Sequence, residues 1–171
     1  MRKYQNMVYS TAARLTNDPA QAEDIAQAVF MKAYERFDEL ALAPTAPGWL
    51  KTVATNLSLN HLSRYRKRLS FIGDWKRDDE DEEIELGPEF ALDETQFDTV
   101  ADEERQQLIE QALQSLPEHQ RVPLVLFHFS EMPYQDIAVE LKVSVAKVKS
   151  DIFRARATLL KHMAIRNAYE H

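Results

Sequence analysis

Residues 133–160 read PYQDIAVELKVSVAKVKSDIFRARATLL, and this segment predicts two helices joined by a tight turn. Pro133 suits a first helical turn, because the N–H that proline lacks would have no intrahelical partner there. Lys142, Val143 and Ser144 interrupt the apolar periodicity, and the Ser144 hydroxyl can cap the N-terminus of a second helix. Apolar residues then recur at steps of three and four, at Val145, Val148, Ile152, Ala155 and Leu159. We therefore expect a short helix followed by a longer one.

The second predicted helix has a polar face opposite its apolar stripe. At about 100° per residue, this face holds Ala146, Lys147, Ser150 and Arg154, with Lys149 and Arg156 at one edge. Small and polar residues flanked by cations are typical of a helix that reads the DNA major groove. The alternative is an ordinary helical hairpin whose lysines and arginines form a solvated surface.

The spacing V-x-x-V-K-S-x-x-x-R-A-R-x-x-L over residues 145–159 resembles the second half of the helix-turn-helix in region 4 of bacterial sigma factors, particularly the extracytoplasmic-function (ECF) group. In that family this helix reads the minus-35 promoter element as duplex. The resemblance implies DNA contacts at Lys147, Lys149, Ser150, Arg154 and Arg156. Two positions differ from the family pattern: Lys142 lies where a turn glycine is common, and Asp151 where an arginine usually follows the Lys-Ser pair. A carboxylate near a phosphate is repulsive, which argues against a DNA contact at Asp151.

Composition limits the classes of function that the chain can have. Its 171 residues allow one domain or two small ones. Cysteine is absent, which excludes disulfides, thiolate metal sites and cysteine catalysis. The three glycines are too scattered for a phosphate-binding loop, and the five histidines have no paired ligand spacing. We therefore expect no enzyme activity, cofactor or metal site. With no long apolar run and no export leader, we expect a cytoplasmic protein without membrane insertion.

The net charge of −7 is divided unevenly along the chain. Residues 1–73 contain ten Lys and Arg against six Asp and Glu, a balance of +4. Residues 74–104 contain two against fifteen, or −13, and residues 105–171 contain nine against seven, or +2. We therefore expect a flexible acidic linker over residues 74–103 between two mildly basic domains. Such weak positive balances predict poor DNA binding by the isolated chain, so a large partner would have to supply most of the affinity.

The first domain is expected to contain three helices, the second starting at a turn made by Asn17, Asp18 and Pro19 and continuing to Phe37. Residues 22–30 of that helix, AEDIAQAVF, resemble sigma region 2.2, which docks on the clamp helices of the polymerase beta-prime subunit. The resemblance implies core-polymerase contacts at Asp24 and Gln27, with Glu23 beside them. The alternative is that these polar residues only keep the helix soluble.

The third helix is expected to open at Gly48 and to run into a basic cluster. The pattern W-L-x-x-V-A-x-N from Trp49, with that cluster, resembles regions 2.3 and 2.4, which engage the melted minus-10 strand. Single-stranded DNA is held by a cationic track together with polar and planar groups. The polar candidates are Thr52, Thr55, Asn56, Ser58 and Asn60, and the basic ones are Arg64, Arg66, Lys67 and Arg68. The family often has Asp at position 60 and Arg at position 63, where this chain has Asn and Ser. Trp49, at the head of an apolar stripe, is expected in the core.

The second domain is expected to begin near Glu103 or Glu104 with a helix that ends at Leu116-Pro117. The pattern L-x-x-L-P-x-x-x-R over residues 113–121 resembles region 4.1, whose following helix supports the helix-turn-helix and touches the polymerase flap. His119 and His128 are expected at the surface or in a satisfied polar contact. The tail over residues 162–171 has no apolar stripe, and we expect it to fray.

Together these patterns predict an all-α protein of two small helical domains. Residues 1–73 correspond to sigma region 2, residues 74–103 to the linker and residues 104–171 to region 4. The resemblance implies a non-catalytic ECF-type sigma factor whose partners are core RNA polymerase, through the beta-prime clamp and the beta flap, promoter DNA and an anti-sigma factor. Two alternatives remain at this point: a stand-alone helix-turn-helix regulator, and a degenerate sigma-like protein that binds polymerase or an anti-sigma factor without reading DNA.

Overall fold

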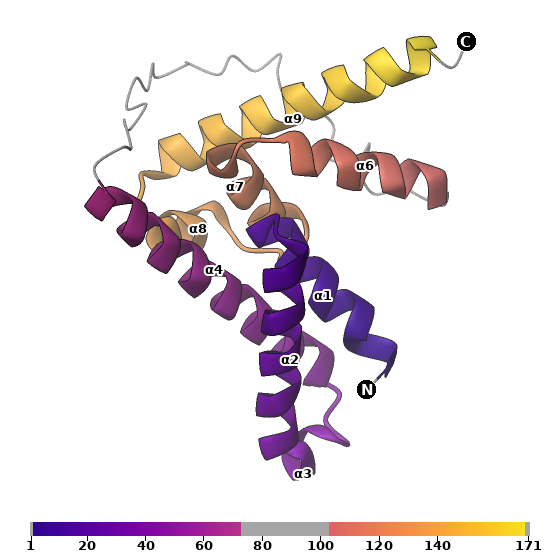
Figure 1. Ribbon diagram of the computed structural model, residues 1–171, viewed down its shortest axis with the longest axis vertical. Helices are drawn as coiled ribbons and strands as arrows, with labels where there is room; N and C mark the ends of the chain where they lie inside the picture. The colour runs from indigo at the N-terminus through magenta and orange to yellow at the C-terminus, as the bar shows by residue number, and fades with distance from the viewer. Residues whose placement is uncertain (1, 73–102, 170–171) are drawn as a thin grey trace. The chain divides into compact units, whose positions relative to one another are not determined.

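A computed structural model describes the backbone of residues 2–72 and 103–169, and the side chains of residues 2–64 and 107–162. Within these ranges every element of regular structure is a helix (Figure 1), which confirms the all-α prediction. The helices form two compact units, α1 to α4 and α6 to α9. The predicted acidic linker, except its last residue Glu103, lies outside the described residues, as do the side chains of Arg66, Lys67 and Arg68.

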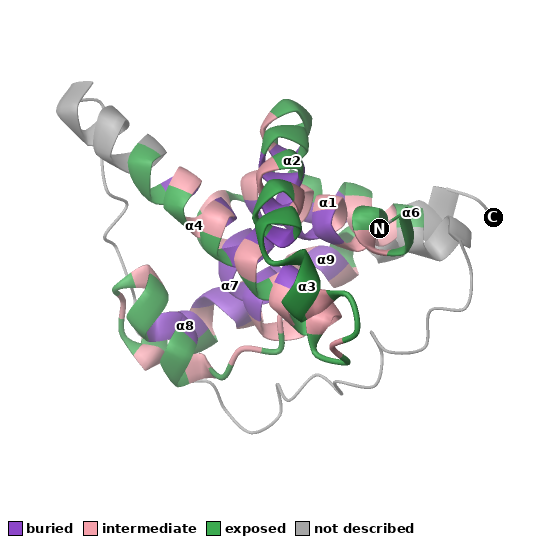
Figure 2. Ribbon diagram, turned by 90° about the horizontal axis from the view of Figure 1, so that it is seen from below, coloured by how far each residue is buried: buried purple, intermediate pink, exposed green. Residues whose placement is uncertain are grey.

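The first unit packs three long helices against one another. Helix α1 spans Arg2–Thr16, α2 spans Pro19–Glu35 and α4 spans Ala46–Ile72, and each of the three contacts the other two. Their shared core appears as the buried segments of these helices in Figure 2 and consists of Val8, Ala12, Ala22, Ile25, Ala26, Val29, Ala33, Leu50 and Ala54. Trp49, which was predicted in the core, is half-buried and packs against it.

The predicted turn before α2 is confirmed, and its local chemistry explains where the helix begins. Asp18 has an extended backbone, and its Oδ1 accepts a hydrogen bond from the Gln21 N–H at 3.2 Å. Pro19 follows at the first helical position, where its missing N–H has no cost. Asn17 adopts a positive φ of 52°, a conformation that asparagine tolerates better than most residues.

Two boundaries in the first unit differ from the prediction. Helix α2 stops at Glu35 rather than Phe37, because Arg36 leaves the helical conformation with φ −113° and ψ 24°. A short helix α3, Phe37–Leu40, follows and was not predicted. Helix α4 begins at Ala46, two residues before Gly48, because the Trp49 N–H already bonds to the Thr45 carbonyl at 3.0 Å.

In the second unit, three helices pack on a fourth. Helix α6 spans Glu103–Ser115, α7 spans Glu118–His128 and α8 spans Tyr134–Leu141, and all three contact α9, Val145–Tyr169. Four members of the predicted apolar stripe of α9 are at most 2% exposed: Val148, Ile152, Ala155 and Leu159. They pack in a unit whose other buried apolar residues include Leu113, Leu116, Val122, Val125, Leu126 and Ile137. The predicted helix pair around the turn at residues 142–144 is confirmed.

The turn between α8 and α9 depends on one strained residue and one cap. Lys142 ends α8 in the left-handed conformation, with φ 56° and ψ 45°, and its N–H points at the carbonyls of Ala138 and Val139. Glycine is the usual residue in this conformation because it has no Cβ. The Ser144 hydroxyl oxygen then accepts a hydrogen bond from the Lys147 N–H at 3.1 Å, which caps α9 as predicted.

The expectation that the tail frays is wrong, since α9 continues to Tyr169. A helix needs only its backbone hydrogen bonds to propagate, and the tail contains methionine, alanine and arginine, which favour helix. Near the start of the tail, His162 Nε2 lies 3.4 Å from the Ser115 hydroxyl, which joins α9 to the end of α6. The absence of an apolar stripe therefore did not predict the end of this helix.

Candidate nucleic-acid interface

The N-terminal half of α9 presents the polar face that the sequence predicts. Ala146 and Lys149 are exposed, and Ser150 and Arg154 are partly exposed, while the apolar stripe lies inside. The Ser144 cap fixes where this helix begins, and so fixes which of its side chains lie in the first turn. This geometry suits insertion of a helix N-terminus into a major groove.

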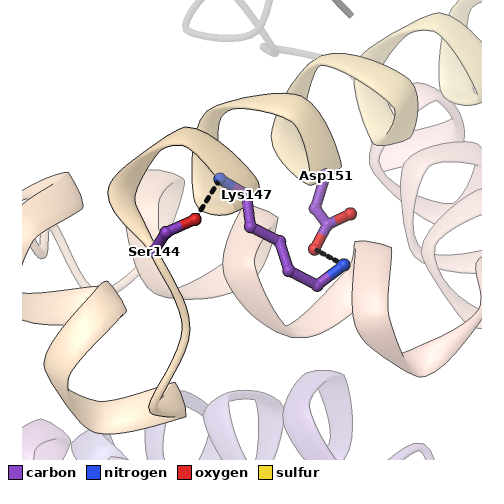
Figure 3. A network of polar contacts seen from close by, with 3 residues as sticks. All are labelled: Ser144, Lys147 and Asp151. Atoms are coloured by element: carbon purple, nitrogen blue, oxygen red, sulfur yellow. Dashed lines mark hydrogen bonds and ion pairs between the residues drawn. The ribbon is translucent and has the colours of Figure 1, made fainter. Parts of the chain in front are cut away.

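Asp151 is not on this face. The residue is 3% exposed, and its Oδ2 lies 3.6 Å from the Lys147 Nζ (Figure 3). Its place in the sequence pattern predicted a carboxylate near phosphate, but the structure places Asp151 at the edge of the buried stripe instead. A helical projection could have indicated this, because residue 151 is three positions after Val148 and four before Ala155.

Lys149 and Arg156 each lie over an aromatic ring of a neighbouring helix. The rings of Phe127 and Tyr134 stack with centroids 4.6 Å apart and planes 12° apart. Lys149 Nζ is 5.9 Å from the Tyr134 centroid, and the Arg156 guanidinium is 5.6 Å from the Phe127 centroid. In such cation–π contacts, the positive charge is attracted to the face of the aromatic ring. They join α9 to α7 and α8.

Arg156 has a second partner in His128. Its Nε donates to His128 Nε2 at 3.2 Å, and its second terminal nitrogen lies 2.9 Å from the same atom. Since a guanidinium can only donate, His128 Nε2 must be the acceptor. The sequence predicts a polar contact or an exposed position for His128, and the polar contact is the one observed. Arg156, a predicted DNA contact, thus has its guanidinium engaged within the domain.

Arg121 is a structural residue that sequence reasoning did not single out beyond its place in the region 4.1 pattern. It is 5% exposed, and its guanidinium donates to the Leu116 carbonyl at 3.1 Å, across the turn between α6 and α7. Burial lowers the pKa of the Arg121 guanidinium, while the negative charge of Glu118 acts in the opposite direction. The bond satisfies the carbonyl of Leu116, the residue directly after α6, where helix carbonyls run out of partners in the next turn.

Helix α4 exposes a polar ridge. Thr52, Asn56, Asn60 and Arg64 are all exposed, and their four-residue spacing places them one turn apart along the helix. We call these four residues the α4 ridge. The other two polar candidates face inward: Thr55 is 5% exposed and Ser58 is fully buried. Their hydroxyls donate to the carbonyls one turn earlier, at 2.9 and 2.7 Å, so they are excluded from a surface contact.

Helix α2 exposes a second surface, which extends further than predicted. Glu23, Asp24 and Gln27 are exposed, as expected for a docking face. Met31 and Tyr34 continue the same side of the helix and are 69% and 77% exposed. They lie four and seven residues after Gln27, so the helical spacing could have identified them, although neither was predicted as part of this surface. We call these five residues the α2 face.

Family models match both units of the chain. The model described as Sigma-70 region 2 matches residues 1–68, and the model described as Sigma-70, region 4 matches residues 106–159. None of the helices in the described part of the chain is long and apolar enough to cross a membrane.

Several bacterial proteins are similar to this chain over most of its length. The RNA polymerase sigma-H factor of Pseudomonas aeruginosa is 32% identical over 160 residues, which cover 93% of this chain and 81% of that protein. The ECF RNA polymerase sigma factor SigW of Bacillus subtilis is 29% identical, covering 94% of this chain and 84% of the relative. The ECF RNA polymerase sigma-E factor of Escherichia coli K12 is 28% identical, covering 92% and 81%.

Among solved structures, the chain is similar to the sigma factor RpoE of Bartonella quintana, which was crystallised with the anti-sigma factor NepR. The TM-score is 0.52 at 23% identity, and the match covers 96% of this chain and 94% of the other, which supports the fold. The two family models match in the order region 2, then region 4. The relatives, which match nearly the whole chain, indicate the same family. The chain therefore belongs to the sigma-70 family of RNA polymerase sigma factors, as a member of its ECF group.

Proposed function

We propose that this sigma factor joins core RNA polymerase and directs it to promoters through three surfaces, one on each of α2, α4 and α9. Residues 1–73 form the unit that binds core polymerase and the minus-10 element. Residues 104–171 form the unit that reads the minus-35 element, and residues 74–103 link the two. The protein acts in the cytoplasm as a non-enzymatic initiation factor, without a cofactor or metal of its own.

The α2 face is proposed to dock on the beta-prime clamp. Asp24 and Gln27, with Glu23 beside them, provide polar contacts, and exposed Met31 and Tyr34 add apolar area at the same side of the helix. Large apolar side chains with such exposure are unfavourable in water unless a partner covers them. A surface that combines apolar and polar side chains is common in protein interfaces.

The α4 ridge is proposed to contact the melted minus-10 strand. The side chains of Thr52, Asn56 and Asn60 can hydrogen-bond to unpaired bases, and Arg64 begins the cationic track that Arg66, Lys67 and Arg68 continue in sequence. Single-stranded bases expose hydrogen-bonding edges that a duplex hides, which suits amide and hydroxyl groups on a rigid helix. The family match over residues 1–68 supports this assignment.

The α9 face is proposed to read the minus-35 duplex, with Lys147, Lys149, Ser150 and Arg154 as contacts and Arg156 as a cation near the backbone. The observation that carries this proposal is the capped, polar first half of α9, which stands on an apolar core within the residues matched to region 4. The second unit is proposed to touch the beta flap as well. An anti-sigma factor is a further proposed partner, since the similar RpoE was crystallised with one.

The test is to reconstitute the holoenzyme. Purified chain is mixed with bacterial core polymerase, the complex is isolated by size exclusion, and its binding to promoter duplex is measured beside that of each component alone. We expect promoter-specific binding only by the complex, because the weak positive charge of the flanking domains limits DNA binding by the chain alone. Specific operator binding by the isolated chain as a dimer would instead favour a stand-alone regulator.

A further inference from the structure

Two cations on one side of α9 lie over the same pair of stacked aromatic rings. Lys149 and Arg156 are seven residues apart, so two helical turns, or about 10 Å along the axis, separate them. Lys149 lies over Tyr134, and Arg156 lies over Phe127. The two cations differ in exposure, since Arg156 is half-buried and Lys149 is exposed. The ring pair therefore connects an inner cation to an outer one.

The Tyr134 ring has a fixed position. It stacks on Phe127 with the two planes 12° apart and the centroids 4.6 Å apart. Phe127 is itself held by an edge-to-face contact with His128 and by the guanidinium of Arg156. A tyrosine side chain has few torsions to fix, so it loses little conformational entropy when it is held in this way. The Tyr134 ring therefore offers a rigid surface to the side chain that lies over it.

That side chain is Lys149, whose Nζ lies 5.9 Å from the Tyr134 centroid. The attraction between an ammonium and a ring face comes from the charge and the ring quadrupole, and it needs no directed N–H bond. An unrestrained lysine has a long flexible stem and loses much rotamer freedom when it binds a partner. The ring keeps the Lys149 ammonium in one region, so part of this entropy is already lost before DNA binds.

We propose that Tyr134 is a positioning residue that holds the Lys149 ammonium for contact with a DNA phosphate. The inference rests on the proposed function of α9 in reading duplex DNA. Tyr134 is the first residue of α8, the first helix of the helix-turn-helix. In this motif the first helix crosses the DNA backbone, while the second lies in the major groove. An ammonium held at the start of α8 therefore faces the backbone, where it adds affinity that does not depend on sequence.

The experiment uses the full chain in complex with core polymerase. Affinity is measured over a series of salt concentrations for an unrelated duplex and for promoter duplexes in which each minus-35 base pair is substituted in turn. Tyr134→Leu keeps an apolar side chain but removes the ring, and we expect it to lower all these affinities by the same factor, about two- to fivefold. The slope of log affinity against log salt should become shallower by up to about 0.9, the value for one phosphate contact.

Two ring variants separate the ring face from the hydroxyl group and from the shape of the side chain. Tyr134→Phe keeps the ring face and should bind every duplex as wild type does. Trifluorophenylalanine at position 134 has nearly the same shape, but its fluorine atoms withdraw electron density from the ring and weaken its attraction for a cation. It should therefore bind DNA more weakly than Tyr134→Phe, whereas a purely structural role predicts no difference. Val139→Ala, at an exposed position of the same helix, is the control and should match wild type.

Variants of α9 show whether Tyr134 acts through Lys149. Lys149→Ala should weaken binding to promoter and unrelated duplex alike, and Tyr134→Leu should cause no further loss in that background. In an Arg154→Ala background, by contrast, Tyr134→Leu should keep its full effect.

Four results would overturn the proposal. They are a loss in Tyr134→Phe as large as that in Tyr134→Leu, equal binding by Tyr134→Phe and the trifluorophenylalanine variant, a Tyr134→Leu effect that persists without Lys149, and a loss confined to one minus-35 base pair. The first of these would assign the role of Tyr134 to its hydroxyl group. If neither Lys149→Ala nor Arg154→Ala weakens binding to the promoter, the proposed function of α9 fails, and that outcome is distinct from the other four.

Discussion

Arg156 and His128 are joined by a side-chain contact between α9 and α7, in which the arginine Nε donates to the histidine Nε2 at 3.2 Å. His128 and Phe127 form an edge-to-face pair with ring centroids 5.2 Å apart, and the same guanidinium lies over Phe127. The contact therefore fixes the middle of α9 against the helix that supports it. A residue assigned to DNA from its pattern thus has a role in the stability of its own domain.

His128→Phe should weaken this junction. The substitution keeps an aromatic ring but removes the acceptor for Arg156, and a typical hydrogen bond contributes about 1 kcal/mol to stability. We expect the free energy of opening of α7 and α9 to fall by about that amount in native-state hydrogen exchange. The control is His119→Phe, at an exposed position of α7. This substitution should change the free energy of opening by less than about 0.5 kcal/mol. Equal exchange in wild type and His128→Phe would contradict the assignment.

Lys142→Gly should stabilise the turn before α9. Lys142 has a φ of 56°, and the left-handed conformation costs a residue with a Cβ about 1 kcal/mol relative to glycine. We expect a gain of roughly 0.5–1 kcal/mol in the free energy of unfolding of the second unit, measured by hydrogen exchange in α8 and α9. The control is Lys161→Gly, at an exposed helical position, which should lower the free energy of unfolding of the second unit by about 1 kcal/mol. A loss of stability in Lys142→Gly would show that the lysine side chain contributes more than the strain costs.

Arg121→Met should destabilise the second unit by about 1–3 kcal/mol. The substitution removes the donor to the Leu116 carbonyl and leaves that carbonyl buried without this partner. Arg121→Lys should recover only part of the loss, because a lysine lacks the planar fork of the guanidinium. Glu118→Gln, which removes only the neighbouring charge, should have a smaller effect than Arg121→Met. Hydrogen exchange in α6 and α7 is the measurement, and equal losses for Glu118→Gln and Arg121→Met would contradict this account.

Asp24→Ala combined with Gln27→Ala should reduce the affinity of the chain for core polymerase. Both residues are exposed, so the change should leave the fold intact while removing polar contacts worth about 1–3 kcal/mol in the complex. The matched control is Lys32→Ala, at the edge of the exposed side of α2. Affinity can be followed by fluorescence anisotropy of the labelled chain. If Lys32→Ala weakened binding as much as the double substitution, the α2 face would be assigned wrongly.

Lys149→Ala and Arg154→Ala should have the converse effect. We expect each to weaken binding of the holoenzyme to duplex that carries the minus-35 element by about 1–3 kcal/mol, with unchanged affinity for core polymerase. Lys161→Ala removes an exposed cation further along the same helix and should leave minus-35 binding close to that of wild type. Loss of core binding in the Lys149 or Arg154 variant would place these residues in a different interface.

The patterns that predicted the fold correctly are those in which local chemistry is decisive. The cap at Ser144, the turn at Asp18-Pro19 and the buried stripe of α9 each follow from neighbouring residues. The end of α9 was missed because helix continuation depends on backbone bonds and on contacts such as that of His162 with Ser115, which are distant in sequence.

The sequence predicted only part of the candidate surfaces, again because some positions depend on packing between residues that are distant in sequence. Spacing placed Asp24, Gln27 and Lys149 on exposed faces, since a helix has a fixed period. Spacing from Val148 and Ala155 also places Asp151 beside the buried stripe, but its residue type suggested an exposed charge. Met31 and Tyr34 are the reverse case, because they are apolar residues that lie on the surface and were not predicted there. Tertiary packing decides such cases, and it is not encoded in the type of any single residue.

The most direct test of the central claim is transcription in vitro from fragmented genomic DNA, by bacterial core polymerase with and without the purified chain. Sequencing the 5′ ends of the RNA identifies every start. We predict new starts that appear only with the chain and share two upstream motifs at a fixed spacing. No new starts, despite demonstrable binding of the chain to core polymerase, would contradict the claim that this protein directs promoter-specific initiation.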